Sequence, residues 1–430
     1  MNEMLKLHIP EYKELWYRQK IMQDSDTMSY NKGYDIDFEG YDKETGCIAF
    51  PEQKWADWYD YFIDQEPERF YAYVVHERDG EFIGEVNVHK SKDDNWYEMG
   101  IVIEAKYRGR GYAVKALWLL LKHTFEDMNA EAVHNCFEDN RNSAVKTHLS
   151  AGFAEYRRES GIIELLITRE QYFRQKAMRK MTAAINEILA DDRPSIYLYG
   201  SSVLNDFRLG WSDIDILALT QKPISFSQAE KLVGLRQKLL EEEPENPYYR
   251  SFEGGMLALS AFISKEPDCV VYWGTSGQRI TDEYQFDSFC MAELLENGRL
   301  LCGNDVRSSL KSPEYADFYR DVKKHCEAIR RYAQITGKSF YSFGWLLDIA
   351  RGIYTLRYGK VISKTSAGQW ALDNDLCPVK SALEAALKVR ISPKDYICNQ
   401  KILDYAAKLG PDIQRFADVL EKELNMRKNI

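Results

Sequence analysis

The sequence has no apolar run near the roughly 18 residues needed to cross a bilayer, and residues 1–12 lack the basic and apolar stretches of a secretion signal. We therefore expect a cytoplasmic protein with no membrane partner. The eight cysteines are scattered without a CxxC or Cys/His spacing, which disfavours both a zinc site and a disulfide framework. No repeat and no Gly/Ser-rich or Pro-rich linker divides the chain.

Basic residues are also fewer than acidic ones, with 57 Lys and Arg against 67 Asp and Glu. The formal net charge of -10 disfavours binding to a nucleic-acid backbone and suits small cationic partners better. The 430 residues predict two or three domains, and 45% hydrophobic with 29% charged residues is typical of globular proteins. The sequence indicates no oligomeric state.

Strand and helix patterns alternate along the first part of the chain. Residues 70–103 read as a three-strand meander, and a β-α-β-α-β series with helices near 113–128 and 143–153 follows. Residues 168–192 read as one long helix. This pattern predicts a mixed α/β and α+β fold.

The second part of the chain begins with a similar pattern and becomes helical. Strands are expected at 196–200, 213–219 and 256–263, with a helix near 227–240. From about Asp287 onward the amphipathic pattern predicts a helical bundle.

A glycine-rich turn stands between a strand and a helix in the first part. Its glycines let the backbone approach a ligand, and free N–H groups at the helix start favour an anion such as pyrophosphate. A tight turn without a ligand is the alternative interpretation. The residues concerned are Arg108, Gly109, Arg110, Gly111, Tyr112 and Ala113.

This turn resembles the acetyl-CoA loop of the GNAT acetyltransferase superfamily, whose pattern is matched by Arg108, Gly111 and Ala113. A run from Asn140 to Gly152-Phe153 resembles the second signature of the same superfamily. The resemblance implies a GNAT fold over residues 1–168, with acetyl-CoA as cofactor and an N-acetyltransferase activity.

The resemblance also implies two catalytic residues. His148 stands four residues before Gly152, where family members often carry a Tyr that protonates the CoA thiolate, and a His can also donate a proton. Glu98 stands where family members draw a general base, which acts directly or through water. The alternatives are a structural histidine and a solvated carboxylate on a strand.

Residues 24–68 combine acidic and aromatic side chains, with thirteen Asp and Glu against three Lys. Such a surface suits a polyamine or an aminoglycoside through ion pairs and cation–π contacts. A solvated acidic face is the alternative interpretation.

The second part of the chain carries Gly200-Ser201 and then Asp213 and Asp215. Two aspartates two residues apart on a strand face one side and can share a divalent cation. The Gly-Ser turn can hold nucleotide phosphate, so the arrangement suits metal-assisted nucleotidyl transfer.

These residues resemble the polymerase-β-like nucleotidyltransferases, and more narrowly the aminoglycoside (3'')(9)-O-adenylyltransferases of streptomycin and spectinomycin resistance. The resemblance implies a nucleotidyltransferase domain at 169–304 and a helical substrate-binding and ATP-binding domain at 305–430. It implies Mg²⁺ on Asp213 and Asp215. It also implies that three cations hold the ATP phosphates: Arg351, Lys360 and Lys364. The alternative interpretation is that these residues are exposed charges on helices.

The sequence departs from that family at two places. The family's catalytic Glu on the third strand aligns with Ala258, and Glu253 just upstream is the candidate replacement. The acidic residues that hold streptomycin fall near Gly337 and Tyr341. The expected substrate is therefore spectinomycin or another aminocyclitol.

The sequence thus predicts a bifunctional enzyme that modifies aminoglycosides or aminocyclitols, with an acetyl-CoA-dependent and a Mg-ATP-dependent active site. One alternative is an acetyltransferase of a non-drug amine joined to a weak or silent second unit. Another is a second unit that only binds nucleotide or drug.

Overall fold

The computed structural model describes residues 4–35, 37–267, 269–274 and 277–428. The chain forms two compact units, Met1–Lys176 and Ala177–Ile430, and the boundary lies inside helix α5 (Arg169–Ile188). The expected boundary between 168 and 169 coincides with the start of α5. A further division of the second unit at residue 304 stays a prediction.

The first unit is built on a seven-stranded sheet with the order β1-β2-β3-β4-β5-β7-β6. The β4–β5 pair is parallel and the other pairs are antiparallel. The expected meander is confirmed as β2, β3 and β4. The strands are β1 (Leu5–His8), β2 (Arg69–His76), β3 (Phe82–Lys90), β4 (Tyr97–Ile103), β5 (Ala132–Glu138), β6 (Ala154–Glu159) and β7 (Ile162–Thr168).

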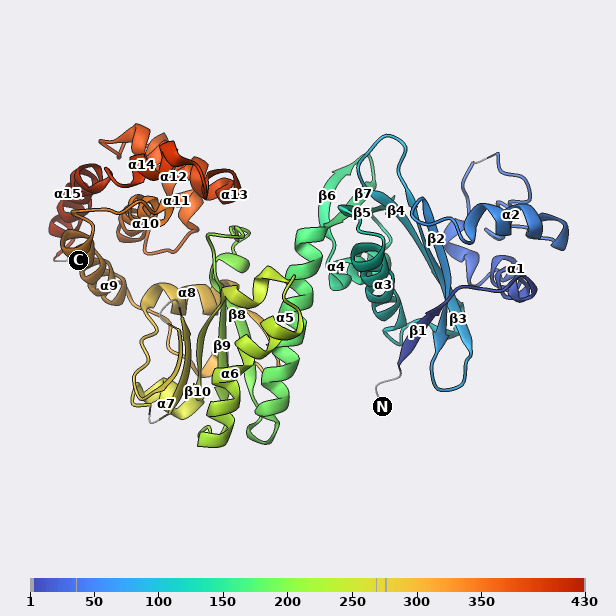
Figure 1. The fold of residues 1–430 in the computed structure, drawn as a ribbon, viewed down its shortest axis with the longest axis horizontal. Coiled ribbons are helices and arrows are strands. Elements are labelled where there is room, and N and C mark those ends of the chain that lie inside the picture. Colours follow the sequence, from blue (N-terminus) through green and yellow to red (C-terminus); the bar gives the residue numbers. More distant parts are fainter. Residues whose placement is uncertain (1–3, 36, 268, 275–276, 429–430) are drawn as a thin grey trace. The chain divides into compact units, whose positions relative to one another are not determined.

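Helices cover both faces of this sheet (Figure 1). The helices α3 (Tyr112–Lys122) and α4 (Asn142–Ala151) lie on one face, and α1 (Trp16–Gln23) and α2 (Trp55–Phe62) on the other. Alternation along β2 produces both cores, because successive side chains of a strand point to opposite faces. Phe70, Ala72 and Val74 belong to the core with α3, whereas Tyr71 and Tyr73 belong to the core with α1 and α2.

The two parallel strands of the first sheet separate soon after they meet. Strand β4 pairs with β5 only at Tyr97–Val133 and Glu98–His134. Both strands then continue, β4 to Ile103 and β5 to Glu138. The carboxyl-terminal halves of β4 and β5 therefore border an opening in the sheet, which we call the β4–β5 opening.

The second unit contains a six-stranded sheet with the order β12-β11-β10-β9-β8-β13. Only the β9–β10 pair is parallel. The strands are β8 (Ser195–Tyr199), β9 (Ile214–Thr220), β10 (Phe252–Ala258), β11 (Val270–Gly274), β12 (Gly277–Thr281) and β13 (Arg299–Cys302). The accompanying helices are α6 (Phe226–Glu242), α7 (Leu259–Ser264) and α8 (Ser288–Asn297).

The strand expected at 256–263 is wrong in its bounds. Strand β10 begins four residues earlier, at Phe252, and residues 259–264 form the helix α7. Gly254 and Gly255 both lie inside the strand. A Cβ on Gly254 would lie 1.7 Å from the carbonyl oxygen of Ile216, so glycine permits this close strand pairing.

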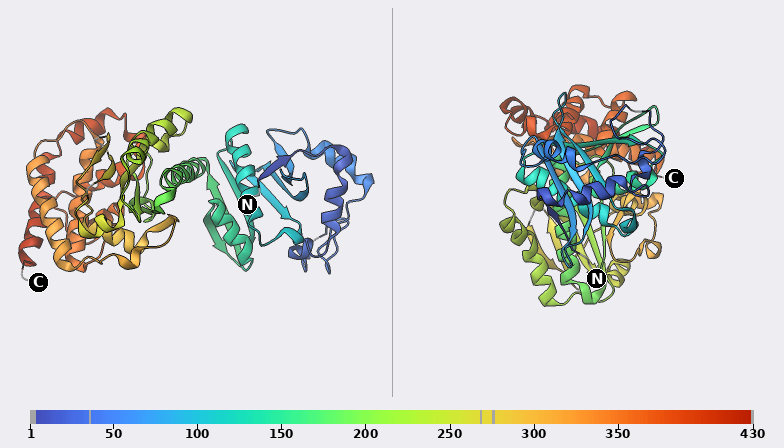
Figure 2. Two further views of the ribbon diagram at one scale, coloured as in Figure 1. Left: turned by 90° about the horizontal axis from the view of Figure 1, so that it is seen from below. Right: turned by 90° about the vertical axis from the view of Figure 1, so that its right-hand side faces the viewer.

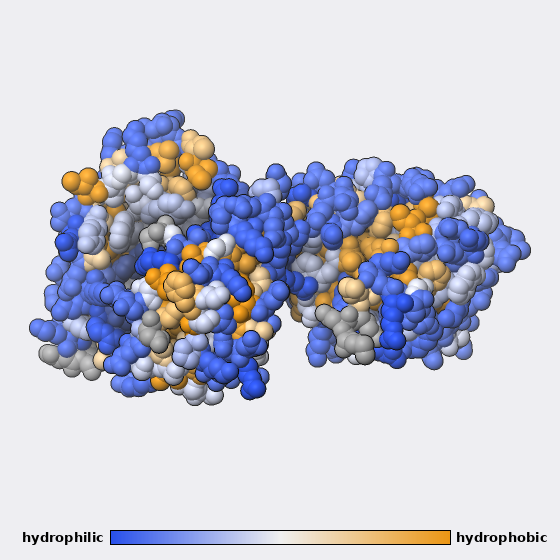
Figure 3. Space-filling view, turned by 60° about the horizontal axis from the view of Figure 1, so that its bottom comes forward, coloured by the Kyte–Doolittle hydropathy of each residue, from blue (hydrophilic) through white to orange (hydrophobic). Residues whose placement is uncertain are grey.

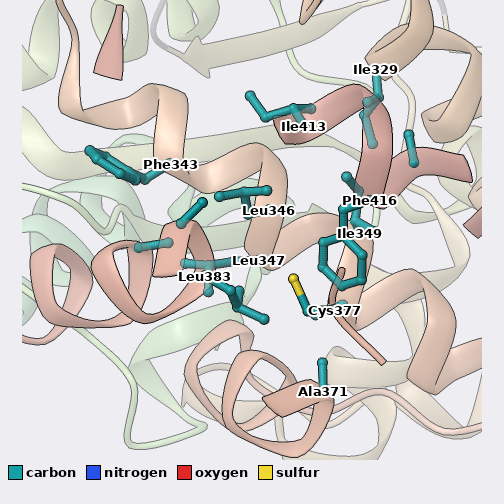
Figure 4. Packing of buried hydrophobic residues seen from close by; sticks show 14 of the residues in the cluster. Ile329, Phe343, Leu346, Leu347, Ile349, Ala371, Cys377, Leu383, Ile413 and Phe416 are labelled. Atoms are coloured by element: carbon teal, nitrogen blue, oxygen red, sulfur yellow. The ribbon is translucent and has the colours of Figure 1, made fainter. Parts of the chain in front are cut away.

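The C-terminal helices form a bundle, as expected, and Figure 2 shows them as a cluster beside the second sheet. Helix α10 is its central element: Ile349 packs beside Phe416, and Leu347 beside Leu383 (Figure 4). No helix in the described part of the chain is long and apolar enough to cross a membrane. The helices are α9 (Tyr315–Tyr332), α10 (Gly344–Tyr358), α11 (Lys364–Asp373), α12 (Lys380–Ile391), α13 (Pro393–Tyr396), α14 (Gln400–Ala406) and α15 (Gly410–Met426).

The visible surface of both units is mainly hydrophilic, and smaller hydrophobic patches interrupt it (Figure 3). This distribution agrees with the high content of charged residues in the sequence.

Candidate functional site

The N-terminus of α3 adjoins the carboxyl end of β4. Gly109 and Gly111 have φ values of +75° and +78°, and a Cβ at either position would meet no atom within 4 Å. Gly111 is the N-cap of α3, and no side chain caps the helix there. Tyr112 and Ala113 form the start of α3, and N–H groups at the start of a helix can bind an anion. Arg110 is exposed beside them.

The guanidinium of Arg108 is bonded to backbone carbonyl oxygens and is not directed toward the start of α3. It donates hydrogen bonds to the carbonyl oxygens of Ile103, Asp26 and Thr27. This arginine therefore fixes the backbone between β4 and α3 to residues 26 and 27. The sequence pattern located the loop but did not reveal this role.

Asn140 is exposed in the turn before α4, and His148 is buried on the inner side of α4. The imidazole Nδ1 of His148 lies 2.8 Å from the carbonyl oxygen of Ala144, and its Nε2 lies 2.9 Å from Nδ2 of Asn135. Burial lowers the pKa of His148, although the bond to Ala144 opposes the change. His148 is accordingly a neutral imidazole that donates through Nδ1 and accepts at Nε2.

Glu98 lies where β4 and β5 separate. Its Oε2 lies 2.8 Å from Nδ1 of His134, the cross-strand neighbour, and its Oε1 accepts a 2.6 Å bond from Nε1 of Trp96. Burial alone would raise the pKa of Glu98, but the bonds from His134 and Trp96 outweigh it and lower the pKa. Burial would lower the pKa of His134, but Glu98 and Glu164 raise it.

His134 is a residue that the sequence did not reveal. It is buried, stacks on Trp96 with ring centroids 4.8 Å apart, and reaches Glu164 of β7 at 3.5 Å. It fixes the position of the Glu98 carboxylate from both neighbouring strands. The only signal in the sequence was the alternation of β5, which places His134 on the same face as Glu98.

Arg18 of α1 also lies on the face of the sheet that carries Glu98. Its guanidinium pairs with Glu85 of β3 and lies 4.7 Å from the ring centroid of Trp58. The Tyr71 hydroxyl donates to the same carboxylate. The acidic and aromatic segment 24–68 thus contributes Trp58 to this face.

In the second unit, a cavity of about 230 Å³ lies between the end of β8, the loop before β9 and the helical bundle. Its lining includes most of the residues that the sequence singled out in this unit. Those residues are Gly200, Ser201, Asp213, Asp215, Arg351 and Lys364, and Asp206, Glu293 and Arg390 join them.

Gly200 has φ +69°, and a Cβ there would lie 2.1 Å from Oδ2 of Asp215. The Gly-Ser turn therefore lies directly against the second aspartate, and only glycine fits. The Ser201 hydroxyl lies 3.5 Å from the carbonyl oxygen of Asp213. This contact joins the turn to the first aspartate.

Glu253 is the cross-strand partner of Asp215, whereas Ala258 is the partner of Thr220 at the other end of β10. Partners in a parallel pair project to the same face, so Glu253 lies beside the aspartates and Ala258 does not. The alignment that put Ala258 at the base position therefore misplaced the strand.

The negative charges of neighbouring carboxylates in this site make ionisation of Asp215 less favourable. Burial raises the pKa of Asp213, and the charge of Lys364 opposes the change. Burial raises the pKa of Asp215 well above its usual range, and the charges of Asp213, Glu293 and Glu253 add to the increase. A buried cluster of this kind has the oxygen ligands and the excess negative charge that suit a hard divalent cation.

Asp213 and Asp215 would supply two protein ligands to such a cation. In the part of the chain that the structure describes, three metal-type ligand atoms gather within 4.8 Å only at His76, Asp79 and Glu81. Mg²⁺ commonly binds one or two carboxylates and completes its shell with substrate phosphates and water. Asp213 and Asp215 fit this mode of Mg²⁺ binding.

The candidate phosphate-binding cations differ in their surroundings. Nζ of Lys364, in the first turn of α11, lies 2.8 Å from Oδ1 of Asp348. Arg351 pairs with the buried Glu293 and donates a 2.9 Å bond to the carbonyl oxygen of Ile362. Lys360 is exposed and is not among the described residues that line the cavity.

Two acidic residues of the cavity were not anticipated from the sequence. Glu293 on α8 holds Arg351, and Asp206 pairs with Arg390 of α12 at 2.7 Å. Both Asp206 and Arg390 are buried. This second pair fixes the loop before β9 to the helical bundle, and long-range pairs of this kind leave no local signal in a sequence.

The acetyltransferase (GNAT) domain model matches residues 6–154. No curated protein matches the chain.

Two solved structures illustrate what the chain is similar to. A GNAT-family acetyltransferase from Bacillus anthracis is 18% identical, with a TM-score of 0.31, over 39% of this chain and 96% of that one. A spermidine N-acetyltransferase from Vibrio cholerae, in complex with CoA and spermine, is 17% identical, with a TM-score of 0.32, over 39% and 97%. Together with the family match, the paired signatures at Arg108–Ala113 and Asn140–Phe153 identify the first unit: residues 6–154 form a GNAT acetyltransferase domain.

Proposed function

We propose that the first unit transfers the acetyl group of acetyl-CoA to an amine of a small cationic acceptor. The β4–β5 opening carries this proposal. The N-termini of α3 and α4 adjoin the carboxyl ends of β4 and β5, and Glu98 marks the point where the two strands separate. An extended cofactor arm fits such an opening, with its pyrophosphate at the N-terminus of α3.

In the proposed reaction the amine nitrogen attacks the thioester carbonyl. A C–N bond forms, the C–S bond breaks, and the amine gives up a proton. Glu98 takes that proton directly or through a water molecule, and His134 and Trp96 hold the carboxylate in place. The departing thiolate takes a proton from solvent, because the buried His148 is neutral and accepts at Nε2.

The acceptor class follows from the face of the sheet that carries Glu98. The alternation of β3, β4, β5 and β7 puts four carboxylates on this face, among aromatic side chains that can contact a cation. They are Glu85, Glu98, Glu138 and Glu164. The acidic segment 24–68 adds a negative field that attracts polyamines and aminoglycosides.

The test is CoA release from acetyl-CoA with spermidine, an aminoglycoside and an uncharged primary amine as acceptors. Turnover with the cationic amines and little with the uncharged amine supports the proposal. Glu98→Gln should lower kcat by about 10²-fold or more, whereas the exposed Glu77→Gln should leave it unchanged. Equal rates with all acceptors would reject the cationic class.

We propose in addition that the second unit transfers the adenylyl group of ATP to a hydroxyl of an aminocyclitol such as spectinomycin. The contact between Gly200 and Asp215, with Glu253 opposite Asp215, supports this proposal. A magnesium ion bound at Asp213 and Asp215 would supply charge stabilisation at the phosphates. Lys364 and Arg351 line the same cavity and are cations suited to phosphate oxygens.

Each residue has a defined task in this proposal. The absence of a side chain at Gly200 lets the Gly200–Ser201 turn lie against Asp215, so the turn would stand beside the magnesium ion and the nucleotide phosphates. Glu253 accepts the proton of the attacking hydroxyl. Asp348 holds Lys364 toward the cavity through their 2.8 Å contact.

Pyrophosphate release from ATP and magnesium, with spectinomycin, streptomycin and kanamycin as acceptors, tests the second proposal. Release with spectinomycin, and its loss in the Asp213→Asn, Asp215→Asn double variant, supports adenylyl transfer. The alternative is a second unit that binds the drug without chemistry, for which the pairing of Arg351 with Glu293 leaves one cation fewer to bind ATP phosphates. Tight drug binding by calorimetry without pyrophosphate release would establish that alternative.

A further inference from the structure

The segment that follows α1 is fixed at its beginning to the loop between β4 and α3. Arg108 donates to the carbonyl oxygens of Asp26 and Thr27. The Thr27 hydroxyl accepts a 2.9 Å bond from the backbone N–H of Ala105. Thr27 is fully buried, so this attachment is part of the core of the unit.

Seven residues later, the same segment is fixed to the end of β5 and the turn before α4. The Tyr34 hydroxyl donates to Glu138 and accepts from Arg141. Arg141 also pairs with Glu138 at 2.6 Å and lies 5.5 Å from the ring centroid of Tyr30. The side chains of Tyr34, Glu138 and Arg141 are half-buried, so solvent weakens their contacts only in part.

The two attachment points lie on opposite sides of the β4–β5 opening. Strands β4 and β5 are parallel, so their carboxyl ends lie at the same edge of the sheet. The first attachment is at the end of β4 and the second at the end of β5. Residues 24–34, which we call the strap, therefore span the opening on the face that carries Glu98.

Tyr30 lies between the two attachment points. Its hydroxyl has a weak acceptor, the sulfur of Met28 at 3.9 Å, and it feels the charges of Glu85 and Arg141. Although 37% of Tyr30 is exposed, burial around its hydroxyl raises the pKa of that group to about 12, so the hydroxyl keeps its proton. It can donate a stronger hydrogen bond to a bound molecule than the one it makes to sulfur.

Because the strap borders the proposed acceptor site, we propose that the hydroxyl of Tyr34, held by Arg141 and Glu138, is a positioning group that fixes the strap and thereby sets amine affinity. This inference rests on the proposed acetyl transfer. Arg141 is adjacent to Asn140, so the turn that is expected to contact the cofactor also holds the strap.

Kinetics of Tyr34→Phe test this role, because the variant keeps the ring and removes only the hydroxyl. The KM for spermidine should rise about tenfold, with kcat and the KM for acetyl-CoA within about twofold. Tyr61→Phe is the matched control, since the exposed Tyr61 hydroxyl also accepts from an arginine, Arg69, at 2.6 Å. An unchanged KM for spermidine in Tyr34→Phe would overturn the proposal.

Limited trypsin digestion gives a readout that does not depend on activity. Lys32 is exposed within the strap, and cleavage after it requires the strap to open. Tyr34→Phe should increase the cleavage rate after Lys32 about fivefold or more, and Tyr61→Phe should not. Faster cleavage in a protein that acetylates no amine rejects the proposed function and keeps the strap attachment, whereas unchanged cleavage rejects the strap.

Discussion

Glu253 and Asp215 lie opposite each other on the parallel strands β10 and β9, with their side chains on the same face of the sheet. The charge of Glu253 is one of the causes that raise the pKa of Asp215. A third carboxylate is thus available beside the aspartate pair, at a position that the sequence alignment had given to Ala258. The second unit therefore has a candidate general base, Glu253.

Replacing Glu253 with Gln should remove the proton acceptor and keep the size of the side chain. We expect adenylyl transfer to fall by about 10²-fold or more in kcat, with ATP affinity little changed. Pyrophosphate release and nucleotide calorimetry measure the two effects. Glu296→Gln, an exposed carboxylate on α8, is the control. Full activity in Glu253→Gln would remove Glu253 from this role.

Asp215→Asn should stabilise the protein in EDTA at neutral pH. The folded-state pKa of Asp215 is raised, so its favourable contribution is present at low pH and is lost as the pH rises through that pKa. The gain in Tm should therefore grow from pH 4 to pH 8, by about 2–4 °C for each kcal/mol relieved. Calorimetry should also show that Mg²⁺ raises the Tm of the parent protein and not that of Asp215→Asn. A variant that is less stable at every pH would contradict this expectation.

Gly200→Ala and Gly210→Ala separate backbone strain from contact with Asp215. Both glycines have positive φ, +69° and +88°, so each alanine costs about 1–2 kcal/mol of strain. A Cβ at Gly200 lies 2.1 Å from Asp215, whereas one at Gly210 meets no atom within 4 Å. ATP binding should be lost only in Gly200→Ala. Equal losses of ATP affinity in both variants would show that the contact with Asp215 is unimportant.

The ion pair of Glu98 and His134 should stabilise the first unit over a defined pH range. The lowered pKa of Glu98 gives stability that is present above about pH 4.5, and the raised pKa of His134 gives stability that is present below about pH 6.5. In melting curves, the loss of Tm in His134→Gln should therefore be largest between these values and shrink toward pH 3 and pH 9. A double-mutant cycle with Glu98→Gln isolates the pair, and a pH-independent coupling energy would refute it.

His148→Gln should change stability more than chemistry. The amide can replace only part of the bonding to Ala144 and Asn135, so we expect a loss of about 1–3 kcal/mol in the free energy of unfolding. The kcat of acetyl transfer should change only severalfold, and the pH dependence of kcat should change little. A loss of 10²-fold in kcat with an unchanged Tm would instead make His148 the proton donor.

From β2 to α5 the sequence predicted the order of strands and helices, because periodicity and glycine positions report local structure directly, but it indicated none of β1, α1 and α2. It predicted the Gly200, Asp213 and Asp215 cluster for the same reason, since these residues lie close together in the chain. It misplaced β10, because an apolar run such as 259–264 has no period that separates a short helix from a strand.

The partners that complete each site could not be predicted in this way. His134 meets Glu98 through strand pairing, Glu293 meets Arg351 across 58 positions, and Tyr34 meets Glu138 across 104. Such contacts depend on how distant elements pack. A single sequence contains no local pattern for them.

The use of Arg108 for three carbonyl oxygens has a consequence for ligand binding at α3. An anion at the start of this helix would be bound mainly by backbone N–H groups, which do not titrate between pH 4 and pH 10. Its affinity should therefore vary little with pH beyond the ionisation of the anion itself. Substitutions of the neighbouring exposed side chain at Arg110 should alter the salt dependence of binding more than the geometry of the bound anion.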